Sequence, residues 1–573
     1  MGRTLRSRFI TIQGGISVFN VFLIMLLGLI NLRFDLLLGN MKRYLHGQVW
    51  RLVVGAPLCL LWVYLTLPAL VPNVGYTVVL LPLALNITAT MLEVWTGKKK
   101  PAKRVGWLLS LLFVGTLGVS FYLNVLVVPF HATELRDTPV VRLATEPLPV
   151  MHLEHIRLVP IENARWRADK ILGGMGAGFE IGHLNIQMVD GELYWVAPLD
   201  FRGLMRWWSF REAPGFVMVD AVDAGAPAEF VPAPLKYTRG AFFASDLFRH
   251  VYGQHGDVLL LGPSFELDDE RNPRWVMSIG RPTVGKTGTV VTGVVIVDPA
   301  TGEMREYALA EVPTWVDQVI PEQVAEAHNS WFGRFVHGYW NSVIGQRDVH
   351  LPTAWEGEVD VFGVVGPDGR FYWFTGHTSP GEDDSLMGYT MMDGRTGEIV
   401  YYKDAVGIFN EAAAVASVNA AVADFVGWRG AQPLLYNLYG AESYVVPVLS
   451  ETNILKAIGI VNARTGRTVV EPTMLQAVMA YKQYLGQGIG GIVPTGIAAL
   501  QTLEGEVSRL GSATADGQTV FYLRIAGSER IFTATAALSA EIAVTAVGDR
   551  VSLSYLDTNE AVVPLAAFEN LGF

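Results

Sequence analysis

Three short segments carry the histidine and carboxylate groups that metal sites use. His152-Leu153-Glu154-His155 offers the imidazole and carboxylate ligands that zinc prefers, but on an extended chain its two histidines point to opposite faces. Asp268-Asp269-Glu270 and Glu382-Asp383-Asp384 could supply oxygen ligands to calcium, although neither has the Asp-x-Asp-x-Asp-Gly spacing of a calcium loop. We therefore predict solvated residues in all three segments and no metal site.

Two histidines, His337 and His377, lie among aromatic residues and could act as general bases. A nucleophile that would work with them is missing from the sequence. There is no Gly-x-Ser-x-Gly elbow, and the only cysteine, Cys59, lies in an apolar run. We expect structural histidines and assign no catalytic residue.

Two features could bind a ligand without catalysing a reaction on it. The glycine-rich segment Gly173–Gly178 has the composition of a phosphate-binding loop, but it follows an expected helix, Ala164–Leu172, and precedes an expected strand, Phe179–Met188. A Rossmann loop has the reverse order, so we predict a turn and no nucleotide cofactor. A second candidate is a stacking groove of tryptophans, for which packing inside small sheets is the favoured alternative. These tryptophans are Trp207, Trp208, Trp331 and Trp340.

The charge distribution divides the chain near residue 130. Residues 1–130 contain 12 Lys and Arg but only two acids, Asp35 and Glu93, which leaves 31 basic and 52 acidic residues for 131–573. The larger part therefore carries a net charge of about −21. Such a surface repels phosphates, so we expect no nucleic acid partner.

Four nearly uncharged runs precede this boundary. Each is long enough to cross a hydrocarbon core of about 30 Å at about 1.5 Å per residue. Apart from Glu93 near one end they contain no Asp, Glu, Lys, Arg or His, which favours an anchor over a transporter. We predict four transmembrane helices, at Gly14–Leu32, Leu52–Val71, Tyr76–Trp95 and Gly106–Phe130.

The linkers between these runs predict the orientation. Arg33–Arg51 and Lys98–Arg104 are strongly basic and should be cytoplasmic, which places residues 131–573 outside. Arg3, Arg6 and Arg8 also favour the cytoplasm. Both preferences are met only if one segment fails to cross, for example a re-entrant Gly14–Leu32 or a half-span at Phe34–Leu38. The alternative is an even-numbered bundle with every soluble part in the cytoplasm.

A hairpin pattern recurs beyond an expected stem at 131–163. Gly388–Tyr402 contains an apolar run, a turn at Asp393–Gly397 and a second apolar run, and Gly293–Glu303 and Ile458–Arg467 repeat it. A degenerate first copy is Gly215–Asp220. An aromatic strand precedes each copy and a helical stretch follows it, which predicts antiparallel sheets with helices on one face, an α+β arrangement. The helical stretches are Gly240–Tyr252, Pro321–Val343, Asn410–Phe425 and Pro472–Tyr484.

The hairpin-and-helix unit, with its Asp-x-x-Thr-Gly-Glu turn at Asp298–Glu303 and Asp393–Glu398, resembles the PepSY module of bacterial envelope proteins. The wider pattern, including Val336-His337-Gly338-Tyr339-Trp340-Asn341, is similar to uncharacterised multi-pass membrane proteins of bacteria. The resemblance implies a role in restraining or regulating envelope peptidases. It implies no catalytic residues, and the copy at Asn462 departs from the pattern.

The last part of the chain contains five short segments with strand character between turn signals. Five strands in about 70 residues predict a small closed barrel of OB or SH3 type, with protein contact favoured over nucleic acid binding. The predicted organisation is a transmembrane helical domain at 1–130, a stem at 131–163, a PepSY-like α+β region at 164–486 and a barrel at 500–573.

We therefore expect a membrane-anchored, extracytoplasmic interaction or scaffold protein of the bacterial cell envelope. Its partners would be the lipid bilayer and envelope proteins, with a homo-oligomer also open, and no cofactor is expected. One alternative is a PepSY-type regulator of an envelope peptidase or wall enzyme. Another is an enzyme acting on envelope polymers, which would need a cleft that groups His337, His377 and a carboxylate.

Overall fold

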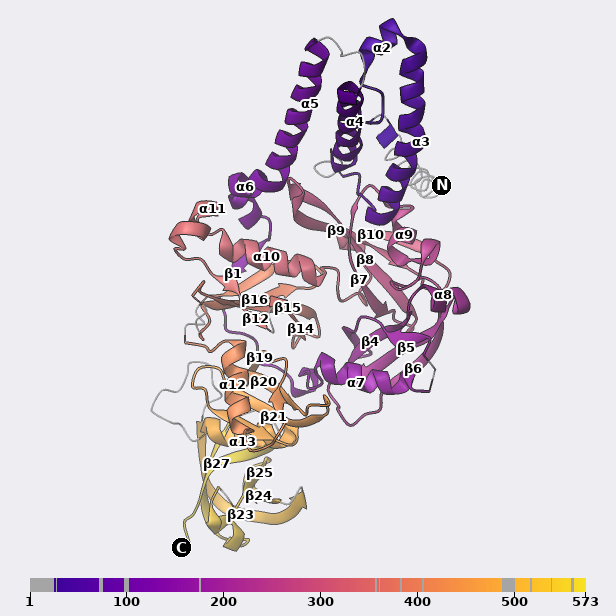
Figure 1. The fold of residues 1–573 in the computed structure, drawn as a ribbon. Coiled ribbons are helices and arrows are strands. Elements are labelled where there is room, and N and C mark those ends of the chain that lie inside the picture. The colour runs from indigo at the N-terminus through magenta and orange to yellow at the C-terminus, as the bar shows by residue number, and fades with distance from the viewer. Residues whose placement is uncertain are drawn as a thin grey trace, which may run out of the picture.

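A helical bundle, a group of four antiparallel sheets and a closed barrel follow one another along the molecule (Figure 1). The computed structural model describes residues 25–26, 28–71, 76–96, 103–174, 177–355, 358–359, 361–381, 384–403, 407–486, 500–515, 518–536, 538–557 and 561–572.

The bundle contains α2 (Phe34–Gly39), α3 (Met41–Thr66), α4 (Tyr76–Thr96) and α5 (Lys103–Phe121), which continues through the π-helical turn η2 (Tyr122–Leu126) into α6 (Val127–Arg136). Among the described residues, Met41–Thr66 and Ser110–Arg136 are long and apolar enough to cross a membrane.

The bounds of two predicted membrane runs differ from those of the helices. The second, Leu52–Val71, has the wrong bounds, because its helix begins eleven residues earlier, at Met41, and ends at Thr66. The first, Gly14–Leu32, lies largely outside the described residues. Its described part is helical to Gly28 but not at residues 29–33, and the half-span considered at Phe34–Leu38 is the short helix α2.

Two contacts attach the bundle to the sheets. Beyond the end of α3, the carbonyl of Pro68 accepts the Tyr252 hydroxyl at 2.9 Å, and the Leu70 amide donates to the Gly256 carbonyl at 2.9 Å. On the other side, α6 packs through Val127 in one apolar cluster with Phe335. The bundle and the sheets therefore meet at both α3 and α6.

Each of the four larger sheets is built on an antiparallel meander, and a separate two-stranded sheet pairs β12 (Ala354–Trp355) with β13 (Glu358–Val359). The first sheet contains β2 (Phe179–Ile181), β3 (Asn185–Val189), β4 (Glu192–Phe201), β5 (Ala213–Asp220) and β6 (Glu229–Leu235). The second contains β7 (Leu259–Leu267), β8 (Pro273–Val284), β9 (Thr287–Val297) and β10 (Met304–Ala308). The third contains β14 (Phe362–Val365), β15 (Phe371–Thr378), β16 (Gly388–Asp393) and β17 (Ile399–Tyr402), with β11 (Leu351–Pro352) and a parallel β1 (Val141–Leu143). The fourth contains β18 (Arg429–Gly430), β19 (Leu434–Leu438), β20 (Ala441–Leu449), β21 (Leu455–Asn462) and β22 (Thr468–Glu471).

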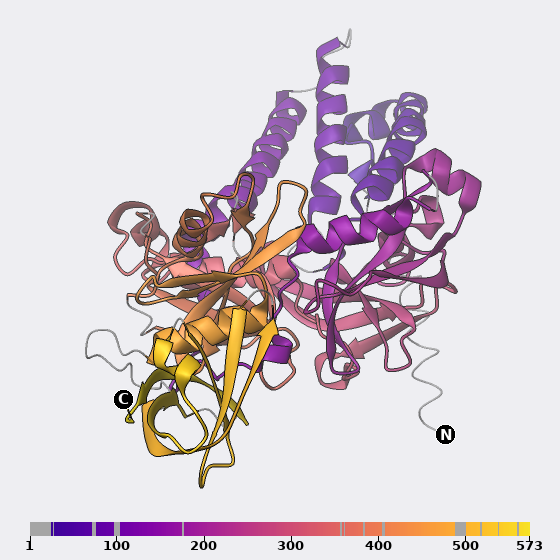
Figure 2. The same cartoon turned by 90° about the horizontal axis from the view of Figure 1, so that it is seen from below.

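The sheets form two halves that lie side by side (Figures 1 and 2). One apolar core joins the first two sheets and extends into the third, and a second core joins the third and fourth. Residues 131–163, the predicted stem, supply the end of α6, the strand β1, a 3₁₀ turn at Leu153–His155 and the start of α7. They therefore belong to the packed structure.

The helices are α7 (Ile161–Leu172), α8 (Leu204–Phe210), α9 (Leu247–Tyr252), α10 (Glu322–Arg334), α11 (Gly338–Trp340), α12 (Glu411–Ala421) and α13 (Met474–Gly486). For three helices the order of helix and sheet differs from the expectation, because α12 packs on β18, β20, β21 and β22, the sheet that follows it. Likewise, α7 packs on β2 and β5, and α10 packs on β11 and β15. In contrast, α13 packs on β21 and β22 of the sheet that precedes it, and also on the barrel.

One hydrogen bond recurs in all four units and holds the segment that precedes each sheet. An aromatic side chain on the second strand of each meander donates to a backbone carbonyl of the segment that leads into it. In the first, third and fourth units that carbonyl lies two residues before α7, α10 and α12. The pairs are Trp195 with Val159 at 2.8 Å, Trp275 with Tyr237 at 2.9 Å, Trp373 with Ile320 at 2.8 Å and Tyr444 with Phe409 at 2.8 Å.

The repeated turn is stabilised within itself. In the third sheet the Asp393 carboxylate accepts the backbone N–H groups of Arg395 and Thr396, both at 2.9 Å. Gly397 has a φ of +75°, which an L side chain rarely adopts. Asp220, Asp298 and Asn462 accept equivalent backbone N–H groups in their own turns. The motif makes hairpins, as its composition predicts.

The predicted barrel is confirmed as a five-stranded closed sheet. The order is β23-β24-β25-β27-β26, and β25 and β27 are parallel. The first strand is 16 residues long, and its two halves pair with β26 and β24. The strands are β23 (Leu500–Ala515), β24 (Gln518–Ile525), β25 (Ile531–Thr535), β26 (Arg550–Leu556) and β27 (Val562–Asn570).

Candidate ligand-binding cavity

A cavity of about 910 Å³ lies where the first three sheets meet. Its walls come from the segment before α7, from β3, β4 and β7, from the β8–β9 turn, from the first turns of α10 and from β14 and β15. The volume falls within the range of about 300–1,000 Å³ that is typical of small-molecule sites.

Arg157 lies in the floor of the cavity and is only 4% exposed. Its guanidinium lies over the Trp195 ring, 5.4 Å from the centroid, and Nη1 donates to the Gly363 carbonyl at 3.4 Å. Its backbone is held as well, because its amide donates to the Tyr436 hydroxyl at 3.3 Å. The side chain thus bridges the first and third sheets.

The rim carries two exposed cations, Arg239 and Lys286, together with the carboxylate of Glu322. His183 also lines the cavity. Desolvation is the main cause that lowers the pKa of His183, and the nearby charges of Arg239 and Arg165 add to the shift.

Two helix N-termini add to the positive charge at the cavity. α7 begins at Ile161 and α10 at Glu322, both residues line the cavity, and neither helix has a side-chain N-cap. The Ile161 amide donates to Oε1 of Gln432 at 3.0 Å. The N-terminal ends of helices carry partial positive charge.

The rest of the lining mixes apolar side chains with neutral polar ones such as Asn185 and Gln318. Trp195 and Trp373 line the cavity, and their indole N–H groups donate to the carbonyls of Val159 and Ile320. Trp331 also lines the cavity, as the stacking-groove hypothesis required. The other tryptophans of that hypothesis do not join it: Trp207 packs on Phe242 and Phe243, and Trp208 and Trp340 are 59% and 68% exposed.

A pair of carboxyls, the fully buried Glu266 and the half-buried Asp317, lies next to the cavity-lining residues Ser264 and Gln318. Glu266 accepts the backbone amides of Asp317 at 2.7 Å and Gln318 at 3.3 Å, as well as the hydroxyl of Ser264. Asp317 accepts the Met188 amide at 3.0 Å. Burial raises the pKa of both carboxyls, and the charge of Glu266 helps to raise the pKa of Asp317 to about 7.

The two predicted candidate bases are in different surroundings. His377 is fully buried, with its Nδ1 2.9 Å from Nδ1 of His350 and its Nε2 3.2 Å from Oδ1 of Asn329. His337 is exposed and lies 2.9 Å from Asp348. Burial lowers the pKa of His350 to about 4 and holds the pKa of His377 well below its usual value. Neither His337 nor His377 lines either of the cavities found among the described residues.

The remaining predicted segments make turns. His152–His155 is a 3₁₀ turn and not a strand, and among the described residues no group of three or more His, Cys, Asp or Glu could hold a metal ion. Asp268 accepts two backbone amides of its own turn and pairs with Arg274 at 3.0 Å. Glu382 and Asp383 lie outside the described residues. The glycine-rich segment, described except for residues 175–176, lies between α7 and β2.

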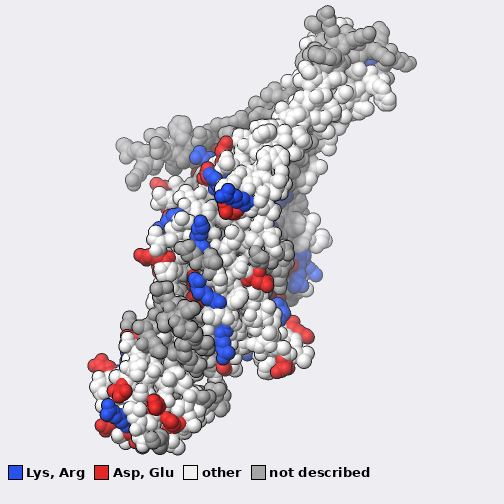
Figure 3. Space-filling model, turned by 90° about the vertical axis from the view of Figure 1, so that its left-hand side faces the viewer, with Lys and Arg blue, Asp and Glu red and all other residues white. Residues whose placement is uncertain are grey.

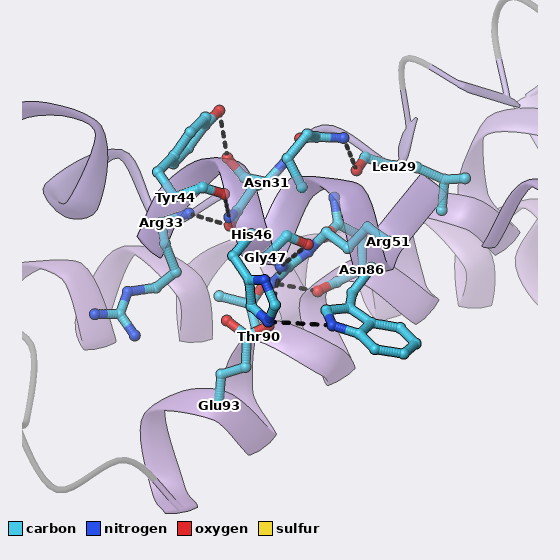
Figure 4. A network of polar contacts seen from close by, with 12 residues as sticks. Leu29, Asn31, Arg33, Tyr44, His46, Gly47, Arg51, Asn86, Thr90 and Glu93 are labelled. Carbon is cyan, nitrogen blue, oxygen red and sulfur yellow. Dashed lines mark hydrogen bonds and ion pairs between the residues drawn. The ribbon is translucent and has the colours of Figure 1, made fainter. Parts of the chain in front are cut away.

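A second polar site, inside the helical bundle, contradicts the expectation that its helices lack ionisable residues (Figure 4). Arg51, placed in a linker by the sequence, is buried in α3. Its guanidinium contacts Asn86 at 2.9 Å, Thr90 at 2.9 Å and Glu93 at 2.9 Å. Asn86 also donates to the carbonyls of Gly28 and Ile30.

This network satisfies the non-helical backbone at residues 29–33. Gln48 donates to the Leu29 carbonyl at 3.3 Å, and the Tyr44 hydroxyl donates to the Asn31 carbonyl at 3.3 Å. Irregular backbone inside a bundle requires such partners. The second predicted run began at Leu52, so Arg51 fell one residue outside it and this site was not predicted.

Comparisons with known proteins give little. No protein-family model and no curated protein matches the chain. One similar solved structure is the GH43_1 enzyme from Xanthomonas citri complexed with xylotriose, at 7% identity over 68% of this chain and 91% of that one, with a TM-score of 0.18. Another is the β-fructofuranosidase from Schwanniomyces occidentalis complexed with fructosyl-erythritol, at 9% identity over 54% and 47%, with a TM-score of 0.13. Likenesses this low carry no argument about fold or activity.

Proposed function

We propose that the chain is a multi-pass, membrane-anchored interaction protein of the bacterial cell envelope that displays its sheets and barrel outside the cytoplasm. The observation that carries the proposal is the position of the basic helix ends. α3 begins with Met41-Lys42-Arg43 and α5 with Lys103-Arg104, and both starts lie at the end of the bundle farthest from the sheets (Figure 1). Basic residues favour the cytoplasmic side.

The surface of the bundle supports a lipid environment. Leu61 and Leu65 of α3 and Val114 of α5 are each more than half exposed. The described part of the bundle is largely uncharged in Figure 3, whereas the sheets and barrel carry scattered charges of both signs. Large apolar areas facing water are costly, and a bilayer removes that cost.

An interaction role is supported by the architecture of the soluble part. Four similar units and a barrel offer extended surfaces, and the repeated turns are used for structure. The strand order of the barrel, with β25 and β27 parallel, favours the OB alternative over SH3. Regulation of an envelope peptidase, implied by the PepSY resemblance, is one form of this role. The separate surroundings of His337 and His377 weigh against the polymer-degrading enzyme.

Cysteine labelling tests the topology. In a Cys59→Ser background, Lys42→Cys places one thiol at the start of α3, and Lys456→Cys places one on β21; both positions are exposed. We expect a membrane-impermeant maleimide to label position 456 on intact cells and position 42 only after permeabilisation. Labelling of position 42 alone on intact cells would reject the proposed orientation.

A further inference from the structure

The cavity receives positive charge from three segments that are distant in sequence. Arg157 precedes α7, Arg239 follows β6, and Lys286 lies in the turn between β8 and β9. The starts of α7 and α10, at Ile161 and Glu322, line the same space, and Glu322 is the one acid among the described lining residues. In a soluble region of net charge about −21, this concentration of positive charge favours an acidic ligand group.

Apolar side chains make up much of the remaining lining and favour an apolar ligand part. Leu260 and Leu261 of β7 line the cavity together with Trp195 and Trp373, beside neutral polar residues such as Asn185. A small inorganic anion would leave these walls in contact with water. A ligand with both an acidic group and an apolar body would satisfy the cations and cover the walls.

The rim of the cavity touches the membrane end of the molecule. Lys286 donates to Oδ1 of Asn124 in η2. The neighbouring Gly285 lies so close to Val127 that an added Cβ would come within 2.8 Å of it. Trp331, a lining residue, packs against the apolar cluster that contains Val127. The cavity is thus continuous with the end of the α5–α6 helix.

We propose that this cavity binds an anionic amphiphile, a molecule with one acidic head and an apolar chain. Arg239 and Lys286 bind the head at the rim, and the tryptophan and leucine walls take up the chain. The source is either a membrane lipid or a free single-chain amphiphile. The inference goes beyond the proposed function and does not depend on which side of the membrane the cavity occupies.

Titration calorimetry on the full chain held in an amphipathic polymer tests this with three probes. Octyl phosphate carries both features, inorganic phosphate only the charge, and octanol only the chain. We expect octyl phosphate to bind at least about tenfold more tightly than either of the others. Equal affinity for octyl phosphate and one partial probe, or no binding of octyl phosphate, would overturn the proposal. Displacement by a short-chain phosphatidylglycerol supports a lipid source, and displacement by single-chain phosphates alone supports a free one.

The double variant Arg239→Gln/Lys286→Gln tests the head site, because both side chains are exposed and their loss should not unfold the chain. We expect octyl phosphate affinity to fall at least about tenfold, the scale of one lost charge-assisted hydrogen bond, with octanol unaffected. The matched control is Arg305→Gln/Lys456→Gln, which removes the same two charges from exposed positions outside the cavity. Equal losses in both variants would refute the assignment. An error in the proposed membrane orientation would change none of these results.

Discussion

The carboxyl pair of Glu266 and Asp317, next to the cavity, makes the stability of the sheets depend on pH. In the folded state burial and the charge of Glu266 raise the pKa of Asp317 from its usual value near 4 to about 7. The folded state therefore holds a proton that the unfolded state releases. Stability from this group is fully present below about pH 4, falls as the pH rises to about 7, and is not regained above it.

The substitution Asp317→Asn removes this titration while preserving the shape of the side chain. The amide oxygen can still accept the Met188 amide, which now lies 3.0 Å from the carboxylate. A pKa difference of about three units corresponds to roughly 4 kcal/mol at pH 8. This figure is an upper limit, because the surroundings relax. We expect Asp317→Asn to match the parent near pH 4 and to be more stable by at least about 1 kcal/mol at pH 8.

Urea denaturation followed by tryptophan fluorescence measures this difference at each pH. Variant and parent must be compared at the same pH, because the buried His350 and His377 make the parent's stability rise between about pH 4 and their usual pKa. Asp424→Asn, which changes an exposed carboxylate just after α12, is the control and should change little at either pH. A free-energy difference for Asp317→Asn that is the same at pH 4 and pH 8 would refute the reasoning.

Three further substitutions test the repeated turn and the bundle. Asp393→Ala removes the acceptor of two turn N–H groups and the partner of Arg370, and should lower the unfolding free energy by about 1–2 kcal/mol in urea titrations. Gly397→Ala should cost about 1 kcal/mol in the same assay, because its φ is +75°. Asn86→Ala removes the donor to two backbone carbonyls and one of the partners of the Arg51 guanidinium. We therefore expect protease in mild detergent to digest the bundle of this variant faster than that of the parent. Thr88→Ala, an exposed change on the same helix, should have no effect.

Local patterns predicted local structure well. The Asp-x-x-Thr-Gly turn could be identified from sequence because the backbone hydrogen bonds that form it lie within six residues, and the glycine has a backbone angle that other residues rarely adopt. The five barrel strands were found for a similar reason, since turn residues separate them. The association of α12 with the sheet that follows it could not be predicted, because a helix between two sheets has the same sequence pattern whichever it covers.

The bundle shows how a charge can mislead a sequence-based boundary. Arg51 looks like the end of a basic linker, and a hydropathy pattern places the membrane run just after it. In the structure the same residue is the centre of a polar network, in which its guanidinium contacts Asn86, Thr90 and Glu93. Whether an arginine ends a helix or is buried in it depends on partners far away in sequence, 35 to 42 residues in this case.

The relation between the repeated units and the cavity follows from what the units share and what they do not. All four use an aromatic donor on the second strand to hold the segment that leads into the sheet, so this feature builds the scaffold. Only the first and third of these side chains, Trp195 and Trp373, also line the cavity. The cations Arg157, Arg239 and Lys286 lie at positions that the repeated hairpin does not include. Because shared residues make the framework and unshared ones supply its charge, substitutions in the repeated turns should change stability in every unit, and only those at the cations should change what the cavity binds.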